Sequence, residues 1–273
     1  MRFQGNIMMP LPKTGKDVRI ACRQGSLVSN TAGLAPGFVQ ANLVIVPANF
    51  AYDFLLFCQR NPKPCPILEV LDKGSPFTSN IADNADIRSD IPKYRVYESD
   101  KIIDEPTSIN KYWRDDLVSF LLGCSFTFDR ALREYGVPVR HEEEGRNVPM
   151  YRTNIPCKGA GVFQGPLVVS MRPMTPNFAL QATNITGRFP RAHGAPIHMG
   201  EPKLIGITDI QKPDYGENVS IHPSEIPVFW ACGVTPQAVA VASKIPFLIT
   251  HSPGHMFVSD WADHQLEGEE KIR

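Results

Sequence analysis

The side chains best suited to acid–base chemistry lie together in one short segment. It reads Arg140-His-Glu-Glu-Glu-Gly-Arg-Asn147 and continues through Val148-Pro-Met-Tyr-Arg-Thr-Asn154. This density of charge beside Gly and Pro predicts a loop or strand edge, and it is not typical of a simple amphipathic helix. In such a place a His and a Glu can exchange protons while an Arg binds an anion. A solvated charged surface loop is the alternative.

Histidines also bracket two loops, His193-Gly-Ala-Pro-Ile-His198 and His251-Ser-Pro-Gly-His255. Neither loop can be the helical zinc motif, because Pro and Gly interrupt both and the required Glu is missing. Rigid loops can still present imidazoles as acids, bases or metal ligands, although a lone His is more often structural. A metal site formed by His193, His198, His251 and His255 is therefore kept as an alternative to a site without metal.

Cysteine chemistry is a further candidate at Cys232. The segment 227–237 predicts a buried strand, a tight turn and a helix that begins at Pro236 with Thr235 as its N-cap. A thiol near a helix N-terminus has a lowered pKa, and such a terminus favours carboxylate groups. A buried, inert thiol is the alternative, and Cys124 presents the same choice.

Nucleotide and hydrolase signatures are missing from the sequence. Lys13-Thr-Gly-Lys16 lacks the upstream Gly of a P-loop and has Asp17 where a hydroxyl is needed. No Gly-x-Gly-x-x-Gly motif follows a strand, and no Gly-x-Ser-x-Gly elbow occurs. We predict no cofactor, and we leave metal dependence open.

The elements that must position these residues alternate along the chain. The patterns predict helices over 14–25, 49–61 and 115–124, strands over 39–46 and 94–97, and a long polar loop over 74–92. This alternation predicts a mixed α/β (α+β) fold with at least partly parallel strand pairing and many Pro- and Gly-rich loops.

A weak internal echo suggests a degenerate duplication. The landmarks Asn49-Phe-Ala51, Arg60 and Pro62 recur at an offset of 128, and Cys124, Thr127 and Pro138 recur at an offset of 108. If the echo is real, two α/β lobes, 1–145 and 146–273, face each other across a ligand cleft. One compact domain over 14–262 is the alternative.

Composition limits the partners. Among 273 residues, 42% are hydrophobic, and 28 basic side chains balance 28 acidic ones, so binding to nucleic acid is not expected. No apolar run is long enough to span a membrane, and the opening residues lack a secretory signal. Six scattered cysteines fit reduced thiols in the cytoplasm, and a mitochondrial location stays open for a eukaryotic source. Both a monomer and a homodimer are compatible with the sequence.

Several long segments, in order, resemble the D-glutamate cyclases, a family also known as hydro-lyases. They are residues 31–42, 57–65, 113–117, 145–154, 229–237 and 250–257. The resemblance departs at Glu142, where the family pattern suggests an apolar residue, so Glu142 is set aside as a functional group. It implies a lyase that removes water from a small carboxylate or amino acid, with closure of D-glutamate to 5-oxo-D-proline as the best-defined reaction. A dehydratase of a small hydroxy acid and a non-catalytic carboxylate-binding protein are the alternatives.

The reaction implied by the resemblance suggests a role for each candidate. It needs a neutral amine, donors for an oxyanion, an acid for the departing hydroxyl and a cation for the untouched carboxylate. For proton transfer we expect His141 with Glu143 or Glu144. Cys232 with His251 or His255 would stabilise the oxygen that is lost. The candidates for substrate binding are Arg60, Arg146, Asn147, Arg152 and Arg172.

Overall fold

The computed structural model describes residues 12–268, so most of the opening segment considered for a signal lies outside the described residues. The helices are α1 Gly15–Arg23, α2 Ala48–Arg60, α3 Phe126–Glu134, α4 Arg140–Glu143, α5 Pro176–Gly187 and α6 Val234–Ala242. The strands are β1 Phe38–Pro47, β2 Ile67–Val70, β3 Tyr94–Glu98, β4 Lys101–Asp104, β5 Leu117–Gly123, β6 Met150–Pro156, β7 Pro166–Met174, β8 His198–Met199, β9 Ile226–Ala231, β10 Leu248–His251 and β11 Phe257–Ala262.

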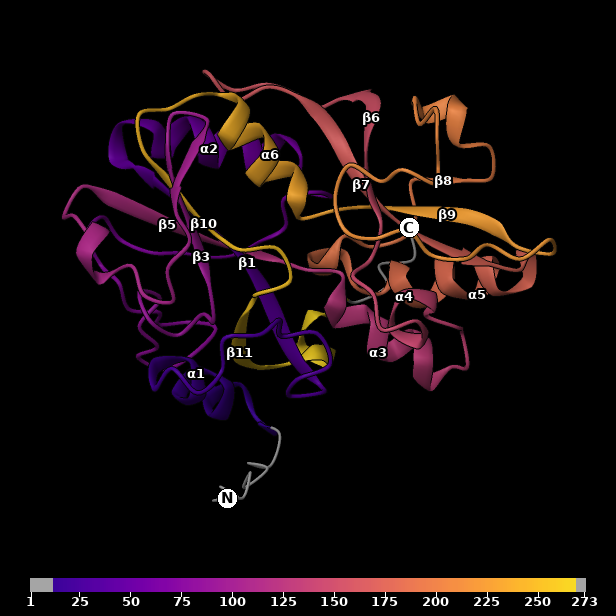
Figure 1. Ribbon diagram of the computed structural model, residues 1–273, viewed down its shortest axis with the longest axis horizontal. Helices are drawn as coiled ribbons and strands as arrows, with labels where there is room; N and C mark the ends of the chain where they lie inside the picture. The colour runs from indigo at the N-terminus through magenta and orange to yellow at the C-terminus, as the bar shows by residue number, and fades with distance from the viewer. Residues whose placement is uncertain (1–11, 269–273) are drawn as a thin grey trace, which may run out of the picture.

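The strands form two sheets that lie side by side (Figure 1). A seven-stranded sheet has the order β2-β5-β1-β10-β3-β4, with β11 also paired to β1, and a four-stranded sheet has the order β6-β7-β9-β8. The mixed α/β class is confirmed. The expected partly parallel pairing is wrong for the described strands, whose pairs are all antiparallel. The reason is that β2, the strand after α2, pairs with β5 and does not return beside β1.

Local sequence accounts for most elements. Thr14 caps α1 through a capping box with Asp17, which satisfies free N–H groups of its first turn. The helix predicted over 115–124 is wrong, because β5 occupies this stretch. A short apolar run does not distinguish a buried strand from a buried helix by period, and β5 is enclosed between β1 and β2. The charged segment predicted as loop or strand edge begins with the single helical turn α4 over 140–143, and the remainder is loop over 144–149 followed by β6.

The internal echo has a structural counterpart. The unit β1–α2 corresponds to β7–α5, and β5–α3 corresponds to β9–α6. The β1–β5 register pairs Val44 with Phe120, and the β7–β9 register pairs Arg172 with Val228. The offset of 128 relates Val44 to Arg172, and the offset of 108 relates Phe120 to Val228, so the repeated positions are paired in the same way in both sheets. This identity of register supports the duplication.

The two sheets share one hydrophobic core. Its largest cluster joins Leu43 of β1, Phe128 of α3 and Trp230 of β9. Strands β10 and β11, from the C-terminal part of the chain, pair with β1 in the first sheet. The division at residue 145 stays a prediction. No helix in the part of the chain that the structure describes is long and apolar enough to cross a bilayer.

Candidate active site

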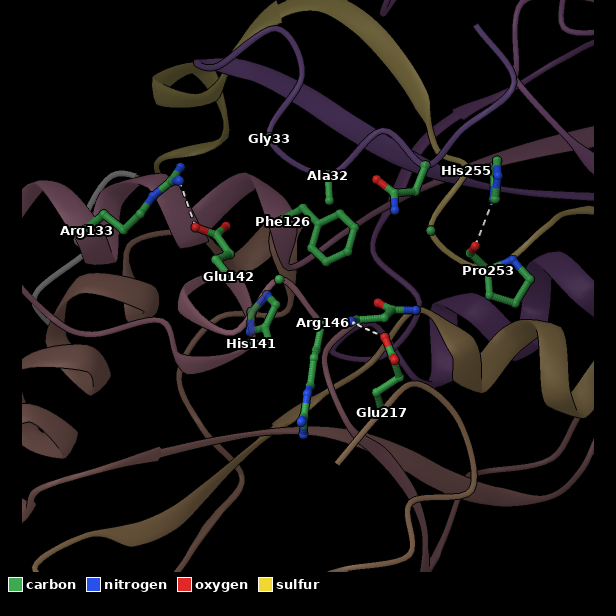
Figure 2. Close-up of a pocket in the computed structure, with 14 residues that line it drawn as sticks. Ala32, Gly33, Phe126, Arg133, His141, Glu142, Arg146, Glu217, Pro253 and His255 are labelled. Carbon is green, nitrogen blue, oxygen red and sulfur yellow. Dashed lines mark hydrogen bonds and ion pairs between the residues drawn. The ribbon is translucent and has the colours of Figure 1, made fainter. Parts of the chain in front are cut away.

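A cavity of about 540 Å³ opens where loops beside the first sheet meet helices α3 and α4 (Figure 2). Loop residues 30–33 and 253–255 form one side. The opposite side is formed by Phe126 and Arg133 of α3, His141 and Glu142 of α4, and the loop residues Gly145, Arg146, Asn147 and Glu217. The cavity therefore brings together four of the residues predicted from sequence, His141, Arg146, Asn147 and His255.

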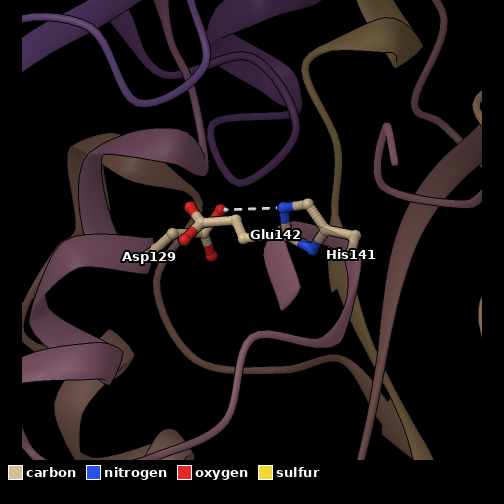
Figure 3. A group of neighbouring side chains, drawn as sticks. All are labelled: Asp129, His141 and Glu142. Carbon is tan, nitrogen blue, oxygen red and sulfur yellow. Dashed lines mark ion pairs between the residues drawn. The ribbon is translucent and has the colours of Figure 1, made fainter. Parts of the chain in front are cut away.

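His141 is almost fully buried in the wall of this cavity. Its ring stacks against Phe126 with centroids 6.4 Å apart, and its Nε2 lies 3.7 Å from Oδ2 of Asp129 (Figure 3). Its Nδ1 is buried and has no hydrogen-bond partner among the described residues. Burial lowers the pKa of His141 to about 4, although Asp129 opposes the shift. The imidazole is therefore neutral near pH 7 and can serve as a proton acceptor.

Asp129 is itself held by a buried arginine. Arg172 of β7 donates from Nε and from a terminal nitrogen to the two carboxylate oxygens of Asp129, each at 2.8 Å. The guanidinium is fully buried and lies between the rings of Phe128 and Trp230, with Cζ 5.1 and 5.3 Å from their centroids. Arg172, predicted as a substrate clamp, therefore lies behind the cavity, where its charge balances that of Asp129.

Glu142 lies in the cavity wall, although its departure from the family pattern predicted no functional role for it. Burial raises the pKa of its carboxyl, and the nearby charge of Asp129 adds to the shift. Arg133 donates to Glu142 at 2.7 Å and limits the rise. A carboxyl with a raised pKa in a cavity is a candidate general acid. Phe126, Asp129 and Arg133 are spaced three and four residues apart along α3. Helical spacing of this kind puts side chains on one face, and it is the sequence signal that could have predicted their proximity.

Polar groups of the loops complete the cavity. The backbone N–H of Asn147 donates to Glu217 at 2.9 Å, and Arg146 lies 3.4 Å from Glu144 while donating to the carbonyl of Asn218. Nδ1 of His255 lies 2.8 Å from the carbonyl of Pro253. With Nδ1 donating, Nε2 of His255 is left as an acceptor.

The remaining predicted acids lie at the back of α4. Glu143 is half exposed, lies 3.1 Å from Arg140 and does not line the cavity. Glu144 accepts a hydrogen bond from the Ser220 hydroxyl, which lowers the pKa of its carboxyl. Glu144 thus stays ionised and supports Arg146 from behind.

Cys232 occupies the predicted position near a helix N-terminus, but with different chemistry. Burial raises the pKa of its thiol to about 11, so the expected lowering is wrong. The expected cap is also wrong, because α6 begins at Val234 with Gly233 as N-cap. Asn42 leaves room only for glycine at this cap, because a Cβ on Gly233 would lie 2.1 Å from its Nδ2. Thr235 does not cap the helix, because its hydroxyl forms hydrogen bonds with the backbone N–H and carbonyl of Val168.

Three other candidates contact groups away from this cavity. His251 is buried, with Nδ1 2.7 Å from the Ser252 carbonyl and Nε2 3.1 Å from Oδ1 of Asn42. Arg60 donates to the carbonyl of Gly159. Arg152 donates to the hydroxyl of Tyr215 and lines a second cavity.

Metal ligands could come from Asp129, His141 and Glu142, whose ligand atoms lie within 4.8 Å of one another (Figure 3). Both carboxylates already bind guanidinium groups, Asp129 that of Arg172 and Glu142 that of Arg133. These pairs cancel the negative charge that would attract a divalent cation. Among the described residues, His193, His198, His251 and His255 do not form such a group. These side chains therefore do not suit a divalent metal ion, and the reaction considered below uses the protein's own acids and bases.

The buried histidines predict that the folded protein becomes less stable as the pH falls. Burial lowers the pKa of His141, His193 and His251 to about 4, from an ordinary value of 6.5. Between these values the unfolded chain binds more protons than the folded one. The free energy of unfolding should therefore fall as pH decreases from 6.5 towards 4, by up to roughly 3 kcal/mol for each histidine. Urea unfolding at pH 7 and pH 5 measures this, and His193→Gln should weaken the dependence. Equal midpoints at both pH values would contradict it.

A neutral imidazole, a carboxyl with a raised pKa and guanidinium groups around one cavity are the kinds of group that proton-transfer enzymes use, and they make this cavity the candidate active site. Comparison with known proteins identifies the family. The sequence profile of the family described as D-glutamate cyclase matches residues 118–260, and the chain belongs to this family.

Bacterial relatives match along almost the whole chain. A protein of Bacillus licheniformis is 59% identical over 92% of this chain and 95% of its own length. One of Thermoanaerobacter sp. is 58% identical over 92% and 94%, and one of Geobacillus kaustophilus is 56% identical over 93% and 97%. Each is named "Putative hydro-lyase". The family and these names support a lyase.

Proposed function

We propose that this protein cyclises D-glutamate to 5-oxo-D-proline with loss of water. Membership of the D-glutamate cyclase family supports the reaction. The observation that carries it is the proximity of two groups suited to opposite roles in one cavity: His141, which is neutral near pH 7, and Glu142, a partly buried carboxyl with a raised pKa. Cyclisation needs both, because the substrate ammonium must lose a proton and the departing hydroxyl must gain one.

Substrate binding is assigned to the loop side of the cavity. Arg146 is about half exposed, and the backbone carbonyl of Asn218 and Glu144 orient its guanidinium. It can bind the α-carboxylate of glutamate, with the side-chain amide of Asn147 as a second donor. A carboxylate bound here would also favour the protonated form of nearby His141 when it accepts the substrate's proton.

The chemical step follows from these positions. The neutral imidazole of His141 removes a proton from the ammonium, and Asp129 stabilises the imidazolium that forms. The neutral amine attacks the side-chain carboxyl carbon to form the N–C bond, while Arg133 stabilises the oxyanion. Glu142 protonates the departing oxygen as the C–O bond breaks. The second proton of the nitrogen passes to the same oxygen, which leaves as water. Protonated His141 then returns its proton to the Glu142 carboxylate, so the two protons lost by the ammonium balance the two gained by the oxygen.

The reaction is tested by incubating purified, chelator-treated protein with D- and L-glutamate and separating the products by chiral chromatography. We expect 5-oxo-D-proline from the D-isomer alone. A second candidate, dehydration of a small hydroxy acid, is favoured by the hydro-lyase names of the relatives. It would produce an absorbing alkene from the hydroxy acid and no oxoproline from glutamate. Binding of both substrate types without turnover would indicate a binding protein.

Variants of two neighbouring glutamates test which of them is the general acid. Glu142→Gln should lower kcat by roughly 10² to 10⁴, because glutamine cannot donate the proton. Glu143→Gln is the matched control and should leave kcat near the wild-type value, since Glu143 lies outside the cavity. Steady-state kinetics on both variants decides between them. A larger loss in the Glu143 variant would move the acid back to the residue predicted from sequence.

A further inference from the structure

A second cavity of about 420 Å³ lies between β3, β6 and α6. Of the residues that line it, Pro253 is the one shared with the first cavity. The second cavity contains Arg152, which the sequence singled out as an anion-binding candidate and which the proposed reaction does not use. Its volume lies within the range of small-molecule sites.

One wall of the second cavity is a largely apolar face of α6. Residues 234, 237, 238, 241 and 242 line it and recur at helical spacing, and all except Gln237 are Val or Ala. Met150 of β6 and Ile102 of β4 add apolar surface, and Ile102 is 48% exposed. The small side chains of α6 leave space above the helix that an apolar group can occupy.

The charged groups around the second cavity leave one cation uncompensated. Arg95 lies 2.8 Å from Glu105, and Asp100 lies 3.0 Å from Lys244. Arg152 forms no ion pair within residues 12–268. Its guanidinium donates to the neutral hydroxyl of Tyr215 at 3.0 and 2.7 Å and lies 5.4 Å from the Tyr215 ring centroid. The nearby carboxylate of Asp214 accepts a hydrogen bond from the backbone N–H of Arg152 at 2.8 Å. The hydrogen bonds to Tyr215 raise the pKa of the guanidinium, and the charge of Asp214 contributes to the rise. The contacts with Tyr215 fix the orientation of the guanidinium and leave it without a carboxylate in direct contact.

We propose that the second cavity is a binding site for a small amphipathic carboxylate, a ligand with one negative charge and an apolar chain. The carboxylate pairs with Arg152, and the chain packs against Ala238 and Val241 of α6. A second negative charge would find no unpaired cation among the described lining residues. The site is separate from the proposed cyclase site, where Arg146 binds the carboxylate of the substrate.

Octanoate is a suitable probe, and isothermal titration calorimetry measures its binding without turnover. We expect saturable binding to the wild type and at least a roughly 10-fold increase in Kd for Arg152→Gln, which removes a charge-assisted hydrogen bond. Ala238→Trp, which fills the space above α6, should abolish binding. Arg60→Gln is the matched control, because Arg60 also lacks an ion pair among the described residues and lines neither cavity.

Three outcomes would overturn this assignment. The first is no binding of octanoate to the wild type at millimolar concentration. The second is an unchanged Kd in both the Arg152 and the Ala238 variant. The third is loss of binding in Arg146→Gln instead, because that would place octanoate in the first cavity. Circular dichroism verifies that each variant is folded, and the two variants test the site through independent contacts. Because calorimetry does not depend on catalysis, the result stands whether or not glutamate is the substrate.

Discussion

Replacing His141 with Gln is expected to reduce kcat by about 10² to 10⁴, the range typical of a lost general base. Glutamine is similar in size and polarity but cannot accept and return a proton. The loss should appear in kcat more than in KM, because Arg146 and Asn147 still bind the substrate carboxylate. Steady-state kinetics with D-glutamate measures both.

The same variant should remain folded. His141 makes no hydrogen bond among the described residues, and its Nδ1 is buried without a partner. Losing the imidazole therefore breaks no buried hydrogen bond, and the variant should lose less stability between pH 7 and pH 5 than the wild type does. His198→Gln is the matched control, since its Nε2 lies 2.9 Å from the Glu201 carbonyl and it does not line the cavity. A kcat within threefold of wild type would exclude His141 as the base.

Replacing Asp129 with Asn is expected to lower the free energy of unfolding by about 3 to 5 kcal/mol. Arg172 is fully buried between two aromatic rings, and Asp129 is its acidic partner among the described residues. Without that carboxylate an uncompensated charge stays in the core. Urea unfolding measures the loss. Asp116→Asn, at an exposed pair with Arg114, is the control and should have little effect.

A double variant separates the cost of a stranded charge from the value of the pair. Asp129→Leu combined with Arg172→Met replaces both partners with apolar side chains, and much of the lost stability should return. If the double variant is as unstable as Asp129→Asn, the pair itself is stabilising and the stranded charge is not the cause. Activity should stay low in the double variant, because no carboxylate then stabilises protonated His141.

Much of the architecture could be predicted from local patterns. The sequence patterns predicted α1, α2, β1 and β3 close to their observed bounds. The repeated landmarks anticipated the shared register of β1–β5 and β7–β9. The error at β5 has a physical cause: a seven-residue apolar run fits either a buried strand or a buried helix, and its neighbours in the sheet decide which forms.

The sequence by itself determined the family and the mixed α/β class, and it singled out the segment 140–154 as a candidate site. Only the tertiary structure decided which of those side chains face the same cavity. Within one turn of α4, His141 and Glu142 line the cavity while Glu143 points to Arg140. Likewise Arg146 and Arg152 lie in separate cavities, and Arg172 is enclosed with Asp129. These differences depend on tertiary contacts such as the pair between Asp129 of α3 and Arg172 of β7, which are 43 residues apart in sequence, and burial by such contacts shifts the pKa values.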